Sequence, residues 1–154
     1  AAVYQVPEFC QQVDFISVGS NDLTQYLLAV DRNNRRVANL YQSYHPSVLR
    51  ALQEIVTQAK AADTPVSICG EMAGDPRSAL LLMAMGYDTL SMSASSLLRV
   101  KWVLRKISLS RSKEMLDEIW QMDNAAVILS HLDYVLEKEG LGGFIRPMHG
   151  SVHS

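Results

Sequence analysis

The chain has 154 residues, of which 48% are hydrophobic and 19% charged, and its 14 basic and 16 acidic side chains give a formal net charge of −2. A single soluble globular domain of this size can bury roughly two-thirds of its unfolded surface, so its core depends on neither disulfides nor metals. The near-zero net charge disfavours nucleic acid as a partner. The sequence has no apolar run of roughly 20 residues, which disfavours a membrane span. The low number of cysteines, 2, indicates a reducing, cytoplasmic location.

The first predicted unit is a strand followed directly by a helix. Residues 13–18 form a short apolar run that Gly19 stops, which is typical of a buried strand. The polar residues 20–22 favour a helix start, and the stretch 23–30, rich in Leu, Gln and Ala, predicts the helix. A polar loop over 31–36 separates this unit from the next.

A second helix and a second strand come next. The helix is introduced by residues 45–47, and its apolar positions recur at the spacing of one helical face: Val48, Leu49, Leu52, Ile55, Val56 and Ala59. Residues 66–69 predict a short strand that ends at Gly70. Residues 76–85 predict a helix that is apolar on nearly every side and is therefore buried.

The third strand is predicted over 89–93, and Ser95 or Ser96 can cap the helix predicted over 97–107. Strands that alternate with helices imply a parallel sheet with right-handed crossovers, although three strands do not close a barrel. Ligands of such sheets bind at the carboxyl ends of the strands. We therefore expect the chemistry at the three strand ends, which are residues 19–22, 69–71 and 91–93.

The last part of the chain is predicted to be helical. Residues 112–122 and 125–138 indicate two amphipathic helices, with Gly140 as the stop. We expect a frayed tail over 147–154.

The turn at residues 19–22 suits an anion. Gly19 lets the backbone approach a ligand closely, and the helix start offers free N–H groups and a positive dipole end. Asp22 is a hard oxygen ligand that could hold Mg²⁺ beside a phosphate, since Mg²⁺ binds one or two carboxylates plus substrate oxygens. The alternative is that Asn21 and Asp22 only cap the helix, and spacing alone favours the cap.

Arg32 and Cys69 each have a functional and a structural interpretation. Arg32, near the end of the predicted helix, could grip phosphate or carboxylate, or could be solvated beside Arg35 and Arg36. Cys69, between an apolar strand and a glycine, could act as a nucleophile or proton donor, or could fill the core. The neighbouring Glu71 favours the acid, because a nearby carboxylate tends to keep a thiol protonated.

The remaining notable residues receive structural interpretations. A solvated helix face is predicted from Arg99, Lys101, Arg105 and Lys106. The apolar face opposite it consists of Leu97, Val100, Val103, Leu104 and Ile107. Core positions are predicted for Met72, Met83, Met85 and Met92. We expect no zinc site, because metal-ligand spacing on an ordered element is lacking at His45, His131, His149 and His153.

Four segments carry a resemblance to a known family. Residues 13–26 (VDFISVGSNDLTQY) and 28–32 (LAVDR) closely resemble the phosphoenolpyruvate-binding domain of Enzyme I, the phosphoenolpyruvate–protein phosphotransferase of the bacterial phosphotransferase system. Residues 68–75 (ICGEMAGD) and 90–93 (LSMS) match the next two strand-end motifs of that family in the right order.

The resemblance extends from about residue 3 to residue 146. The ending 139–146 (EGLGGFIR) and the pair Asn33-Asn34 are similar to the nitrogen-related paralogue rather than to the sugar-transport enzyme. The resemblance implies that residues 1–146 form the last three strand–helix units of a (β/α)₈ TIM barrel, plus C-terminal helices.

The resemblance also implies a site. Asn21 would bind the phosphate of phosphoenolpyruvate, Asp22 would bind Mg²⁺ and substrate, Arg32 would bind the anionic groups of the substrate, and Cys69 would be the proton donor. The full enzyme would transfer phosphoryl from phosphoenolpyruvate to its own histidine and then to a small HPr-like phosphocarrier, releasing pyruvate. It would form a homodimer through this domain, with Trp102 and Trp120 offering contact surface.

The chain also departs from the family pattern. Ser20 stands where Thr is usual, a mild change that keeps the hydroxyl. The second Mg²⁺ carboxylate, the other substrate-binding arginines and the phosphorylated histidine are expected upstream. Residues 5–7 only faintly resemble the motif that carries that carboxylate, because they offer Gln and lie too close to Asp22.

The leading hypothesis is therefore a C-terminal fragment of an enzyme, a phosphoenolpyruvate–protein phosphotransferase. Truncation is favoured by the start without Met and by the length of 154 residues, since a TIM barrel has roughly 250. We expect the isolated chain to be inactive or nearly so. One alternative is pyruvate phosphate dikinase or phosphoenolpyruvate synthase, against which residues 71–75 and 91–93 argue. Another is a non-catalytic dimerisation module.

Overall fold

Three parallel strands lie at the centre of the structure, which is a computed structural model describing residues 1–145. Two 3₁₀ turns, η1 and η2, cover Ala2–Gln5 and Ala38–Leu40. The strands are β1 (Ile16–Gly19), β2 (Val66–Cys69) and β3 (Thr89–Ser91). The helices are α1 (Val6–Cys10), α2 (Ser20–Leu28), α3 (Pro46–Ala61), α4 (Glu71–Gly74), α5 (Pro76–Met85), α6 (Ala94–Lys106), α7 (Leu109–Ile119), α8 (Ala125–Lys138) and α9 (Gly142–Ile145). The predicted frayed tail, 147–154, lies outside the described residues.

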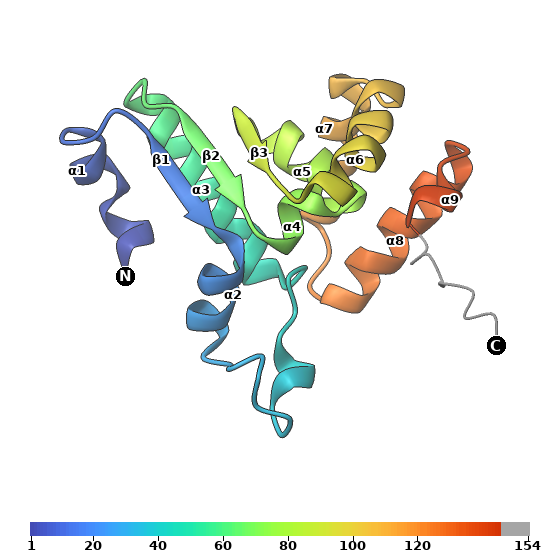
Figure 1. Ribbon diagram of the computed structural model, residues 1–154, viewed down its shortest axis with the longest axis horizontal. Helices are drawn as coiled ribbons and strands as arrows, with labels where there is room; N and C mark the ends of the chain where they lie inside the picture. The colour runs from blue at the N-terminus through green and yellow to red at the C-terminus, as the bar shows by residue number, and fades with distance from the viewer. Residues whose placement is uncertain (146–154) are drawn as a thin grey trace.

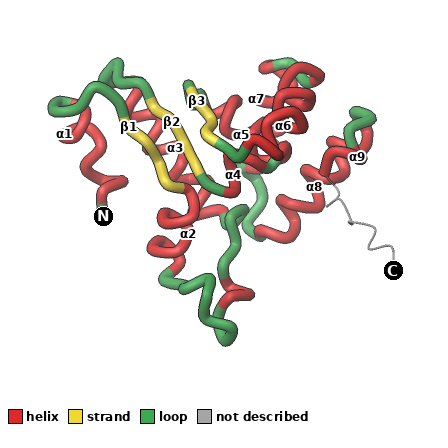
Figure 2. The backbone as a smooth tube through the Cα atoms, in the orientation of Figure 1, coloured by secondary structure: helices red, strands yellow, loops and turns green. Residues whose placement is uncertain are grey.

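The sheet has the order β1-β2-β3, and all pairs are parallel, as the alternation of strands and helices predicted. In the register of the sheet, Gly19 pairs with Cys69, and Cys69 pairs with Ser91. The carboxyl ends of the strands therefore lie side by side, and each leads into a helix (Figures 1 and 2).

The core lies between the sheet and the helices. The apolar face predicted for α3 is buried at every position, and α3 runs behind β1 and β2 (Figure 1). The predicted helix 76–85 matches α5, whose Leu80, Leu81 and Leu82 are fully buried. Each such leucine contributes about 1.5–3 kcal/mol through removal of its side chain from water.

The C-terminal helices pack against this centre. α5 contacts α7, α8 and α9. The ring of Trp102 on α6 stacks on that of Phe144 on α9, with 5.9 Å between the ring centroids. The predicted helix 125–138 matches α8 at both ends, and Gly140 follows it with a positive φ of 74°.

Several predicted boundaries are wrong. β1 begins at Ile16 rather than at residue 13, because pairing starts where the Ile16 N–H donates to the Pro65 carbonyl, and Phe15 is 63% exposed. α2 begins at Ser20, three residues earlier than predicted, and ends at Leu28, where Ala29 adopts the left-handed conformation with φ 52°.

The third strand–helix unit is also shifted. β3 is shorter than predicted, and α6 begins at Ala94 with Ser93 as its N-cap residue, so neither Ser95 nor Ser96 caps it. Leu97, expected on the buried face, is half exposed, whereas Val100 and Val103 are buried. No described helix is long and apolar enough to cross a membrane.

Candidate functional site

A cavity of about 710 Å³ opens at the carboxyl ends of the three strands. Each strand end contributes to its lining: Asn21 after β1, Cys69, Gly70 and Glu71 after β2, and Ser91, Met92 and Ser93 after β3. The lining also includes Arg77 of α5, Arg99 of α6 and Phe144 of α9. Thus Cys69 and Asn21, two of the four predicted site residues, share one cavity with the third strand end. Met92 was predicted to fill the core but lines this cavity.

Asn21 connects the first two strand ends. Its side-chain Oδ1 accepts a hydrogen bond from the backbone N–H of Glu71 at 3.3 Å and another from the Tyr41 hydroxyl at 3.4 Å. The N-cap residue of α2 is Gly19, and no side chain caps this helix. The capping interpretation of Asn21 and Asp22 is therefore wrong. The side-chain Nδ2 of Asn21 has no partner among the described residues, so it can donate to a ligand.

Asp22 lies in the first turn of α2, and its side chain is exposed. Its Oδ2 lies over Gly19, about 3.6 Å from where a Cβ on that residue would stand. Within residues 1–145, no group of three or more His, Cys, Asp and Glu gathers around one point. Asp22 therefore offers one free carboxylate at the strand end. This carboxylate could serve as one protein ligand of a Mg²⁺ ion whose other ligands are waters and substrate oxygens.

Cys69 stands at the end of β2 as a free, partly exposed thiol. The next residue, Gly70, has φ 101° and ψ −168°, a conformation that only glycine adopts readily. A Cβ on Gly70 would lie 2.4 Å from Ser20 Oγ and 3.2 Å from Asn21 Oδ1. The glycine thus allows the turn after the thiol to pass directly against the start of α2.

Arg32 reaches the site from the loop after α2 rather than from a helix end, because α2 ends four residues earlier. Its Nη1 forms an ion pair with Glu71 Oε1 at 3.2 Å, and the side chains of Arg32 and Glu71 are 42% and 70% exposed. Glu71, which was expected to keep the Cys69 thiol protonated, thus has its charge offset by Arg32. The pair places the guanidinium beside Glu71, which follows Cys69 by two positions in the sequence, whereas neither Arg32 nor Asp22 lines the cavity itself.

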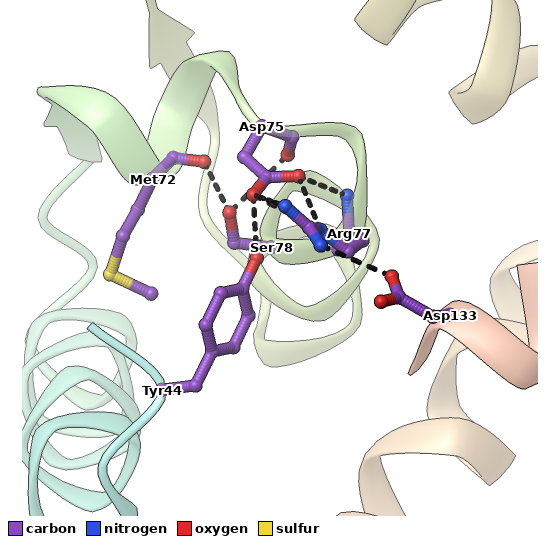
Figure 3. Close-up of polar contacts among 6 residues, drawn as sticks. All are labelled: Tyr44, Met72, Asp75, Arg77, Ser78 and Asp133. Atoms are coloured by element: carbon purple, nitrogen blue, oxygen red, sulfur yellow. Dashed lines mark hydrogen bonds and ion pairs between the residues drawn. The ribbon is translucent and has the colours of Figure 1, made fainter. Parts of the chain in front are cut away.

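One polar cluster was not predicted from the sequence, and two of its members, Asp75 and Arg77, line the cavity. Figure 3 shows Tyr44 and Asp133 directed at Asp75 and Arg77, which lie at the start of α5. Burial, followed by the charge of Asp75, raises the pKa of the Tyr44 hydroxyl above its usual range. Burial lowers the pKa of Arg77, but the hydrogen bonds and charge of Asp75 outweigh it, so the net direction is upward. Both groups therefore stay protonated and donate to Asp75.

One signal for this cluster is present in the sequence. Asp75-Pro76 is a typical N-cap residue followed by proline at the first helical position. That pattern predicts a cap at Asp75, but it contains no information about Tyr44 or Asp133, which come from other elements.

Comparison with known proteins gives a family. The sequence profile described as PEP-utilising enzyme, PEP-binding domain matches residues 1–109. An Escherichia coli protein named phosphoenolpyruvate-dependent phosphotransferase system is 44% identical over 144 residues, which are 94% of this chain and 19% of that protein. A phosphoenolpyruvate-protein phosphotransferase of Borreliella burgdorferi is 38% identical over 82% of this chain and 22% of its own length.

A third relative is the multiphosphoryl transfer protein 1 of Escherichia coli, which is 49% identical over 73% of this chain and 14% of its own length. The chain thus spans about a fifth or less of the length of these curated relatives.

Proposed function

The chain belongs to the PEP-utilising enzymes and carries their PEP-binding domain, and from this premise we propose that residues 1–146 are the C-terminal part of a phosphoenolpyruvate–protein phosphotransferase. The observation that carries the proposal is the meeting of Asn21, Cys69 and the Arg32–Glu71 pair at strand ends that the register aligns. The substrate would be phosphoenolpyruvate and the product pyruvate.

The phosphate would bind at the start of α2. There the free backbone N–H groups of the first turn and the helix dipole favour an anion. Asn21 Nδ2 donates a hydrogen bond, and Arg32 adds a planar pair of donors when it turns from Glu71 to the substrate. Asp22 would hold Mg²⁺, which when bound neutralises charge on the phosphoryl oxygens.

Cys69 would complete the reaction. When the bond between phosphorus and the enol oxygen breaks, the phosphoryl group passes to a histidine of the enzyme and the enolate of pyruvate remains. The Cys69 thiol donates its proton to the methylene carbon of that enolate, giving pyruvate, and regains a proton from water. Its position at the end of β2, on the cavity, suits this role.

The proposed architecture is a (β/α)₈ barrel of which β1, β2 and β3 are the last three strands. In the described part of the chain, β1 and β3 each pair on one side only. Beside the free edge of β1 lies an apolar groove of about 320 Å³, lined by Val3, Phe9, Val13 and Phe15 among others. An unpaired strand edge with apolar side chains favours pairing with further strands.

The proposal extends to partners and location. An HPr-like phosphocarrier would receive the phosphoryl group in sugar transport or nitrogen regulation, and two copies would associate through this domain. Trp102, half exposed on α6, offers apolar contact surface for a second copy. The two free thiols favour a reducing, cytoplasmic location.

The test is an assay of the full-length protein with phosphoenolpyruvate, Mg²⁺ and an HPr-like carrier, following pyruvate release. We expect Cys69→Ala to abolish pyruvate release, and Cys10→Ala, at the other free cysteine, to preserve it. Equal activity of the two variants would overturn the role of Cys69. A requirement for ATP would show a dikinase or synthase instead. The 154-residue chain alone is expected to be inactive or nearly so.

A further inference from the structure

A partly buried cluster of polar side chains lies at the junction of α4 and α5. We call Tyr44, Asp75, Arg77, Ser78 and Asp133 the Asp75 cluster. The Tyr44 hydroxyl donates to Asp75 Oδ2 at 2.9 Å, and Arg77 donates to the same carboxylate through Nε and Nη2, at 3.0 Å to Oδ1 and 2.9 Å to Oδ2. Arg77 Nη1 forms an ion pair with Asp133 Oδ1 on α8 at 3.1 Å. Figure 3 shows Tyr44 and Arg77 bound to the Asp75 carboxylate, and Asp133 of α8 joined to the cluster through Arg77.

Asp75 does more than cap a helix. A cap needs one side-chain oxygen, and Asp75 Oδ1 serves this purpose by accepting from the Arg77 backbone N–H at 3.0 Å. Oδ2 is not needed for the cap, yet it is bound by both Tyr44 and Arg77. The side chains of Arg77 and Asp75 are 21% and 24% exposed, so their pairing is shielded from water more than a surface ion pair is.

The cluster holds the far end of a short helix whose near end follows the turn at Cys69. α4 consists of four residues, Glu71–Gly74, between the turn at Cys69 and the cluster. At the near end, the Glu71 N–H is bound by Asn21. At the far end, the Ser78 hydroxyl contacts the Met72 carbonyl at 2.6 Å and the Asp75 carbonyl at 3.3 Å.

The body of α4 has little freedom to absorb movement. Met72 and Ala73 are buried, and Gly70 already passes against Ser20 and Asn21. A displacement of Asp75 therefore has to move the turn at Cys69, because close-packed elements transmit shifts rather than absorb them.

From these contacts we propose that Asp75 is a positioning residue for the Cys69 thiol, and that the Arg77–Asp133 ion pair makes α8 part of the same support. This inference rests on the proposed function in one respect, which is the role of Cys69 as proton donor. The placement of the thiol itself can be measured without phosphoenolpyruvate.

The experiment measures, in the full chain, the rate at which iodoacetamide alkylates Cys69. Peptide mass spectrometry identifies the alkylated residue, and the rate is measured as a function of pH. Amide hydrogen exchange over residues 70–74 is measured in parallel. The variants are Asp75→Asn, Tyr44→Phe and Asp133→Asn. Asn is as good an N-cap residue as Asp, so Asp75→Asn removes the charge that Arg77 needs while keeping the cap.

We expect Asp75→Asn to raise the exchange of residues 70–74 and to change the Cys69 alkylation rate by about fivefold or more, since charge-assisted bonds are the strong ones. Tyr44→Phe and Asp133→Asn should change both in the same direction by about twofold. Alkylation of Cys10 is the internal control. Asp88→Asn, which removes an ion pair with Lys60 beside the opposite end of β2, is the matched control and should leave both readouts unchanged.

The proposal is overturned if Asp75→Asn and Tyr44→Phe lower the free energy of unfolding without changing the two readouts. In that case the Cys69 alkylation rate and the amide hydrogen exchange of residues 70–74 would equal those of the Asp88→Asn control. If Asp75→Asn does not fold, Tyr44→Phe, which removes one hydroxyl, decides the question alone. Because no substrate is present, a failure here is distinct from a failure to bind phosphoenolpyruvate.

Discussion

The side-chain oxygen of Asn21 accepts a hydrogen bond from the backbone N–H of Glu71 at 3.3 Å, and this contact joins the first turns of two helices that follow neighbouring strands. The same oxygen accepts from the Tyr41 hydroxyl, which belongs to the long segment between α2 and α3. Asn21 thus fixes the spacing between the start of α2 and the turn that carries Cys69. This spacing also explains why only a glycine fits at position 70.

Gly70→Ala is expected to destabilise the fold strongly. The backbone φ of 101° disfavours any side chain, and the new Cβ would lie 2.4 Å from Ser20 Oγ. Backbone strain of this kind costs about 1–3 kcal/mol, and the clash adds to it. Urea unfolding measures the loss. The control is Gly143→Ala, since nothing lies within 4 Å of a Cβ there, and an equal loss in both variants would contradict the interpretation.

Ser20→Ala is expected to leave the free energy of unfolding almost unchanged. Ser20 is 1% exposed, and its hydroxyl has no hydrogen-bond partner among the described residues. Removing a buried polar group that has no partner leaves no other group unsatisfied, so the cost is within about 0.5 kcal/mol.

Combined with Gly70→Ala, the Ser20→Ala change removes the atom at 2.4 Å and should recover part of the lost stability. Urea unfolding of the double variant checks this. Strict additivity of the two single changes would show that Ser20 does not constrain Gly70.

Part of the structure could be predicted because local signals agreed with tertiary packing. α5 and α8 have the predicted bounds since each begins with a residue whose side chain caps the helix, Asp75 and Asn124, and each buries an apolar face. The ends of β1 and β2 were also located from short apolar runs that stop at glycine, whereas β3 ends at Ser91, two residues before its predicted end.

The rest depends on contacts between distant parts of the chain. α4 has four residues and therefore no periodicity to detect. Tyr44 and Asp75 are 31 positions apart, and Arg77 and Asp133 are 56 apart, so their pairing follows from how the helices pack. Likewise Asn21 matches the sequence pattern of a helix cap, and only the position of Glu71 shows what its side chain binds.

Asp88→Asn is expected to have a pH-dependent effect on stability. The hydrogen bond from Lys60, followed by that from the Val66 N–H at 2.9 Å, lowers the pKa of Asp88 below its usual value. A carboxyl whose pKa is lower in the folded state stabilises the fold above its unfolded pKa, about 3.9, and this contribution disappears as the pH falls through the folded value.

The Asp88→Asn variant should therefore be less stable than the original chain at pH 7, by at most about 1 kcal/mol because the ion pair is exposed to solvent, and this difference should shrink below about pH 4. The carboxylate is 39% exposed, so salt should also reduce the difference. Urea unfolding across pH measures it. A difference that stays constant down to about pH 3 would contradict the assignment.

Asn21→Asp is expected to separate anion binding from folding. Asp keeps an oxygen that accepts from the Glu71 N–H and the Tyr41 hydroxyl. A negative charge in the first turn of α2 also interacts favourably with the helix dipole, so stability should stay the same or rise by about 0.5 kcal/mol.

The Asn21→Asp substitution removes the free Nδ2 donor, however, and places a negative charge where the proposed function puts a phosphate. The apparent affinity of the full-length enzyme for phosphoenolpyruvate should therefore fall by about 10- to 100-fold. Asn21→Ala provides the comparison, because it loses the bond to Glu71 as well and should cost about 1 kcal/mol of stability in urea unfolding. If Asn21→Asp binds phosphoenolpyruvate as tightly as the original enzyme while Asn21→Ala does not, the side chain only supports the turn at Glu71 and does not contact the substrate.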